Sequence, residues 1–234
     1  MSLQLLYHPL ASYCWKVLIA LYENGAPFEA RVIDLAKPEQ RSELLALWPV
    51  GKFPVLRDSE RGDVVPESSI IIDYLDQVTP AAAPLIPREP TAALQARLWD
   101  RFFDAYVHEP MQKIVADHFR AEGRHDADGV AQARATLATA YAMLEQRLPQ
   151  DGWAAGGGFG IADCAAFPAL FYAGVLAPFA DAGPRLAAYF DRLCARTSVV
   201  RTIKQAQPCF PMFPMHADIP PRFFDPDAES FARG

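Results

Sequence analysis

The hydrophobic pattern of this chain changes its character about one third of the way along. Up to residue 79, short apolar stretches with the spacing of strands alternate with stretches of helical spacing. Between residues 79 and 90 the chain carries four prolines among alanines, which is typical of a stiff linker. Beyond residue 91 the apolar periodicity is helical throughout. The chain is therefore predicted to fold into a small α/β domain over residues 1–79, a linker over 80–90 and an all-helical domain over 91–207.

Strand-like and helix-like segments alternate within the first domain. Leu3 to Tyr7 is predicted to be a strand, and the helix after it is expected to stop at Gly25. Pro38 is placed to open the next helix, and Gly62 belongs to a hairpin signal. The full set is strands at 3–7, 28–32, 53–56 and 64–65 and helices around 15–22, 38–47 and 67–77. The apolar stripe of the last helix is predicted to consist of Ile70, Ile71, Tyr74 and Leu75.

The second domain is predicted to surround one very apolar helix at residues 161–177. That helix lacks a polar face and should be kinked at Pro168. A long helix that starts at residue 91 should bend at Pro110. Further helices are predicted at 127–148, 184–195 and 199–206.

A proline-rich tail, residues 208–234, follows the last predicted helix. It holds six prolines between Pro208 and Pro226, with large apolar side chains among them. This composition is too apolar for a free disordered tail. We expect the tail to lie extended against the body of the protein.

Charge and cysteine content argue against several classes of protein. The net charge of −6 and the absence of a long basic run make nucleic-acid binding unexpected. No apolar run approaches the ~18 residues of a membrane span, and no secretory signal is visible at the N-terminus. The four cysteines are far apart, lack metal-ligand spacing and are interpreted as reduced thiols. We therefore expect a cytoplasmic protein that binds neither nucleic acid nor a membrane and holds no metal.

The first candidate site feature is the proline of Phe53-Pro54, which falls inside a predicted strand. A proline cannot donate to the hydrogen-bond ladder of a central strand. A cis Phe53-Pro54 bond would turn the strand edge toward a ligand and leave the Val55 N–H and C=O free to pair with an extended peptide. The alternative is a trans proline on an ordinary edge strand.

The second feature is the start of the helix at Glu67 and Ser68. The unpaired N–H groups of a helix start, together with a serine hydroxyl, suit a carboxylate. Glu67 in the same turn would pair with an ammonium group, so the two residues fit an α-amino acid head group. The alternative is simple helix capping by the serine.

The third feature is Ser12, in the loop between the first strand and the first helix. Its hydroxyl could cap that helix or could donate a hydrogen bond to the thiolate of a ligand. A thiol of pKa ~8.5 is only ~3% ionised at pH 7, and a decrease of ~2 units makes it mostly thiolate. That decrease requires only ~2.7 kcal/mol, which one charge-assisted hydrogen bond and a helix start can provide.

Taken together and in this order, the three features resemble the cytosolic glutathione transferase family. The resemblance extends from Leu5 to about Ala206 and is most specific over Lys52–Leu56 and Glu67–Leu75. It implies a thioredoxin-like N-terminal domain and an all-helical C-terminal domain. It also implies glutathione as co-substrate and no metal.

The same resemblance implies roles for individual residues. Val55 would make main-chain contacts with the cysteinyl part of glutathione, and Lys52 would reach its glycyl carboxylate. The helix start would hold the γ-glutamyl end, and Ser12 would stabilise the thiolate, as in serine-type members. The residues implied in glutathione binding are Lys52, Phe53, Pro54, Val55, Glu67 and Ser68.

Three positions depart from the pattern of the family. Tyr7 ends the first strand, where tyrosine-type members keep their catalytic hydroxyl, and is the runner-up to Ser12. Cys14 lies two residues beyond Ser12, away from the catalytic cysteine position of thiol-transferase members. Gly160 replaces the Ser or Thr that usually precedes the helix at Asp163, so Asp163 is expected to accept the Gly160 N–H and to serve folding.

The leading hypothesis is a glutathione transferase that conjugates the thiolate to an electrophilic second substrate. The second site is predicted between the domains, with the 210–215 part of the tail as a further candidate. Two alternatives remain: a thiol–disulfide oxidoreductase or dehalogenase that uses Cys14, and a non-enzymatic protein that binds glutathione or apolar ligands. The resemblance implies a homodimer, with Trp99, Phe103 and Tyr106 either in its interface or in the core. The predicted second-site residues are Leu10, Tyr13, Tyr106 and Met111.

Overall fold

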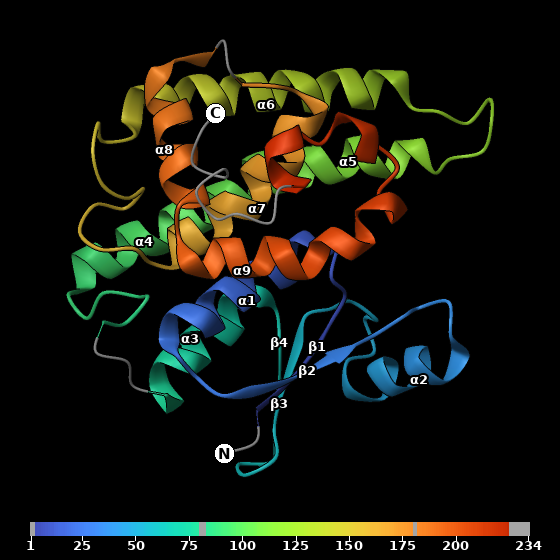
Figure 1. Ribbon diagram of the computed structural model, residues 1–234, viewed down its shortest axis with the longest axis vertical. Helices are drawn as coiled ribbons and strands as arrows, with labels where there is room; N and C mark the ends of the chain where they lie inside the picture. Colours follow the sequence, from blue (N-terminus) through green and yellow to red (C-terminus); the bar gives the residue numbers. More distant parts are fainter. Residues whose placement is uncertain (1–2, 80–82, 180–181, 225–234) are drawn as a thin grey trace.

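The computed structural model of the protein describes residues 3–79, 83–179 and 182–224. The N-terminal third forms a four-stranded sheet with three helices, and helices make up the regular structure of the remaining described residues. Figure 1 shows the sheet and its helices below the stacked helices of the second part. The predicted fold class, an α/β domain followed by an all-helical one, is confirmed.

The sheet has the strand order β2-β1-β3-β4. Its strands are Leu3–Tyr7 (β1), Phe28–Val32 (β2), Val55–Asp58 (β3) and Asp63–Pro66 (β4). β1 pairs with β2 in parallel and with β3 antiparallel, and β3 pairs antiparallel with β4. Successive residues of a strand point to opposite faces. Leu5 and Leu6 therefore belong to two different apolar clusters, one on each face of the sheet.

Three helices cover the two faces of the sheet. Helices α1 (Ser12–Asn24) and α3 (Ser68–Val78) pack on the face of Leu5, and α2 (Pro38–Leu47) packs on the face of Leu6. The three helices and four strands lie close to their predicted positions, although β3 begins two residues later than predicted.

Two residues show how α1 and α3 are bounded and oriented. Gly25 ends α1 as predicted, with a φ of 70° that glycine adopts without steric cost. The predicted stripe of α3 is wrong at Ile70, which is exposed. Ile72 is buried instead, because a second side of α3 contacts the core of the helical part.

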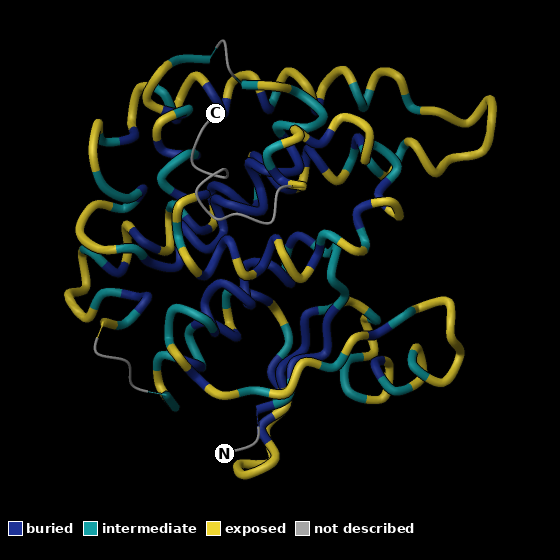
Figure 2. The backbone as a smooth tube through the Cα atoms, in the orientation of Figure 1, coloured by how far each residue is buried: buried dark blue, intermediate teal, exposed yellow. Residues whose placement is uncertain are grey.

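The second part consists of helices around a central buried helix. Helix α7 (Ile161–Leu176) contains Pro168 and is buried over most of its length, as the dark stretches of Figure 2 show. The surrounding helices are α4 (Pro90–Phe102), α5 (Glu109–His118), α6 (Ala127–Arg147), α8 (Pro184–Cys194) and α9 (Thr197–Ala206). None of the helices in the described part of the chain is long and apolar enough to cross a membrane.

A π-helix, Phe103–His108, joins α4 to α5 directly before the bend predicted at Pro110. Proline has no N–H, so an α-helix at this point would leave the carbonyl of Tyr106 without its usual partner. π-helical turns are short, and they occur frequently at functional sites. The π-helix changes which residues of the α4–α5 segment share a face.

The prediction of an extended tail is wrong for the described residues. The tail forms three 3₁₀-helices, Gln207–Met212, His216–Asp218 and Pro221–Phe224. The fixed φ of proline, about −65°, is also the φ of a 3₁₀-helix, so the prolines favour these short turns. The tail nevertheless packs on the body, since Phe210, Phe213, Ile219 and Phe223 are buried. Residues 225–234 of the predicted tail lie outside the described residues.

The two parts of the molecule share a core through α1. Trp15 is completely buried and belongs to the apolar cluster of the helical part, where its ring packs against the rings of Phe167, Phe171 and Tyr172. Leu18, one turn later, belongs to the cluster beside the sheet. Helix α1 therefore lies between the two parts and is buried on both sides.

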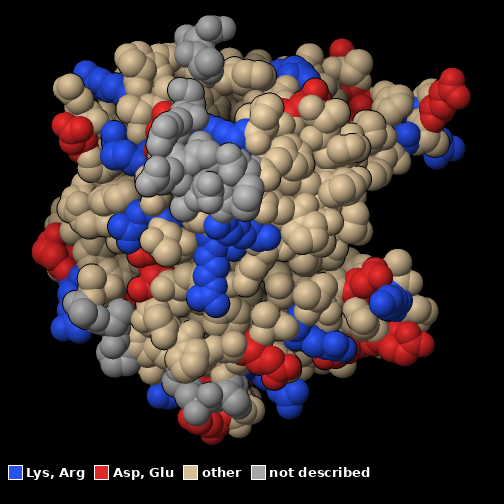
Figure 3. All heavy atoms as spheres, in the orientation of Figure 1, with Lys and Arg blue, Asp and Glu red and all other residues tan. Residues whose placement is uncertain are grey.

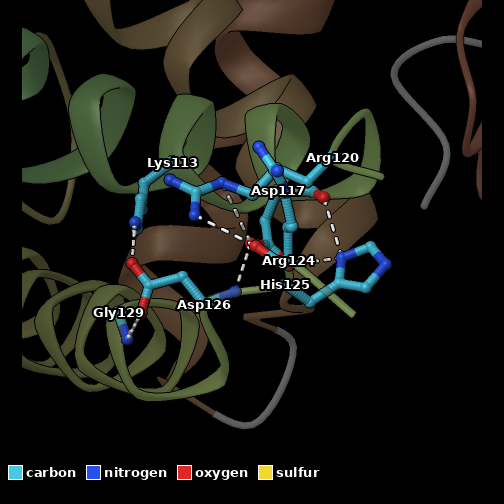
Figure 4. Close-up of polar contacts among 7 residues, drawn as sticks. All are labelled: Lys113, Asp117, Arg120, Arg124, His125, Asp126 and Gly129. Carbon is cyan, nitrogen blue, oxygen red and sulfur yellow. Dashed lines mark hydrogen bonds and ion pairs between the residues drawn. The ribbon is translucent and has the colours of Figure 1, made fainter. Parts of the chain in front are cut away.

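The connection from α5 to α6 projects from the body and is held by polar contacts (Figures 1 and 4). The Asp126 N–H donates to Asp117 Oδ1 at 2.7 Å, and His125 Nδ1 lies 3.1 Å from Asp117 Oδ2. Asp126 in turn caps α6 by accepting the Gly129 N–H at 2.9 Å, and it pairs with Lys113. These contacts order the connection between the two helices.

Candidate active site

Two neighbouring cavities contain most of the predicted site residues. The first cavity has a volume of about 560 Å³, and the second cavity has a volume of about 470 Å³. Tyr13, Lys52 and Phe53 line both, so the two cavities share a wall. Figure 3 shows a hollow in the molecular surface between the side that carries α5 and the side that carries α2. The second cavity lies in this region.

The first cavity lies between the loop before β3, the start of α3 and helix α4. Its polar lining residues are Tyr13, Trp48, Lys52, Glu67, Ser68, Ser69, Arg97, Asp100, Arg101, Asp104 and Glu109. Its wall therefore carries cations, carboxylates and an open helix start.

Glu67 has an unusual backbone conformation at the start of α3. Its φ is 69°, the only positive φ of a non-glycine residue in the described ranges. Such strain is costly and tends to occur at functional sites. Glu67 is the N-cap of α3, yet among the described residues no side chain caps the first turn. The alternative in which Ser68 simply caps the helix is therefore not what the structure has, and this helix start is available to an anion.

The loop before β3 has the predicted cis Phe53-Pro54 bond. The role predicted for Val55 is wrong, because Val55 is completely buried in β3 and has sheet partners on both sides, Leu6 and Pro66. It has no edge open to a peptide ligand. Phe53 precedes the strand and lines both cavities.

Ser12 is the first residue of α1 and lines the second cavity. It is 7% exposed. The N-cap of α1 is Ala11, and no side-chain hydrogen bond to this first turn is found in the described part of the chain. The Ser12 hydroxyl is therefore not used for capping, and it lies at the positive end of a helix dipole. Both properties suit the stabilisation of a thiolate beside it.

The two other catalytic candidates lie in the core. Cys14 is completely buried beside the sheet, and burial raises the pKa of its thiol. The prediction that Cys14 could act as a nucleophile is therefore wrong, because a reactive cysteine must be accessible and easily ionised. Tyr7 belongs to the same cluster, and burial raises the pKa of its phenol as well. The described lining of the two cavities contains neither residue.

Three of the four residues predicted for the second site line the second cavity: Leu10, Tyr13 and Met111. The prediction for Tyr106 is wrong. Tyr106 is 53% exposed and lines a separate groove between α4 and α6. Tyr106 lies within the π-helix and Met111 in α5, and residues five positions apart in a helix of 3.6 residues per turn do not share a face.

Several lining residues of the second cavity were not predicted. Gln112, Val115, Ala116 and Phe119 follow Met111 at helical spacing on α5, so this periodicity could have identified them. Tyr172 and Phe213 carry no such local signal, because they come from α7 and from the tail. The Tyr172 hydroxyl donates to the Leu10 carbonyl at 2.8 Å and so fixes the loop before Ser12.

Asp163 has the structural role that was predicted. It accepts the Gly160 N–H at 2.9 Å, the Ala154 N–H at 3.0 Å and the Tyr189 hydroxyl at 2.6 Å. It is buried and is not one of the residues that line the two cavities. Among the residues that the structure describes, no cluster of three His, Cys, Asp or Glu side chains is arranged to hold a metal ion.

Comparisons with known proteins agree with this geometry. A family model of the glutathione S-transferase N-terminal domain matches residues 5–83, and one of the C-terminal domain matches residues 127–192. Glutathione S-transferase U25 of Arabidopsis thaliana is 31% identical over 82% of this chain and 84% of its own length. Maleylacetoacetate isomerase of Pseudomonas aeruginosa is 28% identical over 89% of this chain and 96% of its own length.

A solved structure agrees as well. A glutathione S-transferase from Methylobacillus flagellatus with GSH bound has a TM-score of 0.79 and 27% identity, and the match covers 86% of this chain and 98% of that one. The fold is shared with these relatives. The chain belongs to the glutathione S-transferase family of enzymes.

Proposed function

We propose that this enzyme binds glutathione in the first cavity and conjugates its thiolate to an electrophile held in the second. One observation carries the proposal: the two cavities share the wall of Tyr13, Lys52 and Phe53, and the uncapped start of α1 at Ser12 lies beside that wall. The thiolate of glutathione, held beside this wall, is within reach of an electrophile in the second cavity. The protein contributes positioning and electrostatic stabilisation, with no covalent intermediate of its own.

The polar groups of the first cavity suit the three parts of glutathione. The open start of α3 at Ser68 suits the γ-glutamyl carboxylate, and the carboxylate of Glu67 suits the neighbouring ammonium group. The main chain of Phe53 takes the cysteinyl part, next to Ser12. Lys52, which is exposed at the shared wall, takes the glycyl carboxylate.

The second cavity favours an apolar or aromatic electrophile. Its wall contains Phe53, Met111, Phe119, Tyr172 and Phe213. Apolar lining with few polar groups is the usual composition of a small-molecule site.

Isothermal titration calorimetry and a panel of electrophiles, peroxides and disulfides test the proposal. The wild-type protein should bind glutathione and turn over at least one electrophile. Ser68→Ala should weaken glutathione binding, because it removes a hydroxyl from the γ-glutamyl site. Ser42→Ala, an equal change at an exposed position on α2, should leave binding unchanged. Glutathione binding without turnover on the whole panel would favour the non-enzymatic alternative, and no binding at all would refute the proposal.

We also propose that the protein is a cytoplasmic homodimer. The groove between α4 and α6 has a volume of about 800 Å³. Large apolar side chains are exposed on or next to it: Leu94, Leu98, Tyr106 and Met143. Of the predicted stripe, Tyr106 lies in this groove, whereas Phe103 is completely buried in the core. Leu98→Glu should shift the molar mass in light scattering toward the monomer, and an unchanged mass would refute this interface.

A further inference from the structure

A lysine is completely buried directly behind the wall of the first cavity. Lys16 lies on α1, one helical turn after Ser12, and is fully enclosed. Its ammonium group lies 2.7 Å from Asp100 Oδ1 and 2.8 Å from Asp104 Oδ2, and it donates to Ser69 Oγ at 2.8 Å. The ammonium group therefore donates hydrogen bonds to Asp104 and Ser69 and forms an ion pair with Asp100.

The three acceptors come from different helices and line the first cavity. Ser69 belongs to the first turn of α3, Asp100 to α4 and Asp104 to the π-helix. Ser69 also donates to Asp100 Oδ2 at 2.7 Å, so the hydroxyl is held from both sides. Lys16 therefore connects the start of α3 in the first domain to two carboxylates of the second domain.

Two acidic side chains face the one ammonium group of this cluster. The buried His108 also borders Asp104, with its Nδ1 3.5 Å from Asp104 Oδ1. Burial lowers the pKa of His108, so its ring is neutral at pH 7. Asp100 and Asp104 lie at the wall next to Ser68 and Ser69, which also contains Arg97 and Arg101.

Stability alone does not account for such a cluster. Burying an ion pair costs about as much desolvation energy as its attraction returns, and apolar replacements are often neutral. A rigid buried network instead contributes a fixed geometry, because it holds the groups that take part in it in one arrangement. Here the fixed geometry concerns the first turn of α3, whose N–H groups have no capping side chain among the described residues.

We propose that Lys16 is a positioning residue for the γ-glutamyl end of the ligand. By holding Ser69 against Asp100, it fixes the first turn of α3 relative to the carboxylates on α4 and the π-helix. The protein groups that bind the carboxylate of the γ-glutamyl part and those that bind its ammonium group thereby stay at a constant distance from each other. The inference rests on the proposed binding of glutathione and adds a residue that touches neither ligand.

Lys16→Met tests this inference, because methionine keeps a long apolar stem and removes the ammonium group. KM for glutathione should rise about 10-fold or more, since small displacements of binding groups have effects of this size. The kcat at saturating glutathione should change by less than about threefold, because Ser12 and the second cavity are unaltered. Lys16→Arg should recover part of the affinity. Lys204→Met, an exposed lysine on α9, is the matched control and should behave as wild type.

Amide hydrogen exchange of the ligand-free protein gives a readout that does not depend on glutathione. In Lys16→Met, exchange should accelerate at residues 68–70 and remain unchanged in α6. Unchanged exchange at 68–70, or an unchanged KM, would overturn the inference. If the wild type binds no glutathione, the proposed function fails, and the exchange result still decides whether Lys16 orders this turn.

A Lys16→Met protein that does not fold calls for a milder variant. Ser69→Ala removes the bridging hydroxyl and leaves both ion pairs in place. It should also raise KM for glutathione and accelerate exchange at residues 68–70, by less than Lys16→Met is expected to. If neither quantity changes in Ser69→Ala, the inference is overturned.

Discussion

Replacing Ser12 by alanine removes one hydroxyl from the start of α1 and leaves the helix itself intact. The hydroxyl has no capping role, because the N-cap is Ala11 and the described residues provide no side-chain hydrogen bond to this turn. Ser12 is 7% exposed, so water has little access to replace the lost donor. The main effect should therefore fall on the ligand thiolate and leave folding nearly unchanged.

The size of the effect follows from one charge-assisted hydrogen bond. Such a bond contributes about 1.5–3 kcal/mol, which at 1.36 kcal/mol per pKa unit corresponds to about 1–2 units of the glutathione thiol. If the thiol bound to wild type titrates near ~6.5, it should titrate near ~8 in the Ser12→Ala variant. The thiolate fraction at pH 7 would then fall from about three quarters to about one tenth.

Two measurements check this expectation. The ultraviolet absorbance of the thiolate, followed through a pH titration of the protein–glutathione complex, gives the pKa of the bound thiol directly. The conjugation rate should fall roughly eightfold at pH 7, in proportion to the thiolate fraction, and should approach the wild-type rate at alkaline pH. Ser42→Ala should alter neither quantity.

An unchanged pKa of the bound thiol in Ser12→Ala would refute the role of Ser12. Tyr13→Phe would then be the next variant to measure, since Tyr13 carries a hydroxyl and lines both cavities, whereas Tyr7 lines neither. A rate deficit that persists at alkaline pH would also contradict the reasoning, because a fully ionised thiol no longer depends on a stabilising donor.

Three further predictions concern buried residues. Asp163→Ala should lower the free energy of unfolding by about 3–5 kcal/mol in urea titrations, because two N–H groups and the Tyr189 hydroxyl lose their acceptor. Burial lowers the pKa of His108 in the folded protein, so the unfolded chain takes up a proton there at a higher pH than the folded chain does. The free energy of unfolding should therefore decrease less between pH 7.5 and 5.5 in His108→Asn than in wild type. Cys14→Ala should keep glutathione-dependent activity, and mass spectrometry of the native wild type after exposure to oxidised glutathione should detect no adduct at Cys14, because this thiol is fully buried.

Local sequence patterns were sufficient for most of the fold. The strand Leu3–Tyr7 and the helix Pro38–Leu47 have the predicted bounds, because apolar alternation and an opening proline act within a few residues. Asp163 was also predicted correctly, since its main partner, the Gly160 N–H, lies three residues away. The tail was predicted less well, because its prolines are equally compatible with extended and 3₁₀ backbone.

The candidate site shows the same difference between local features and features that depend on distant segments. The sequence by itself indicated the helix starts near Ser12 and Ser68, because each is a local backbone feature, but it placed Phe53 inside β3 and not in the loop before it. Only the tertiary structure decided that Val55 is enclosed by neighbouring strands, that Cys14 is inaccessible and that Lys16 meets two carboxylates from the second domain. The physical reason is that burial and charge pairing depend on which distant segments meet, and no periodicity within one helix specifies that meeting.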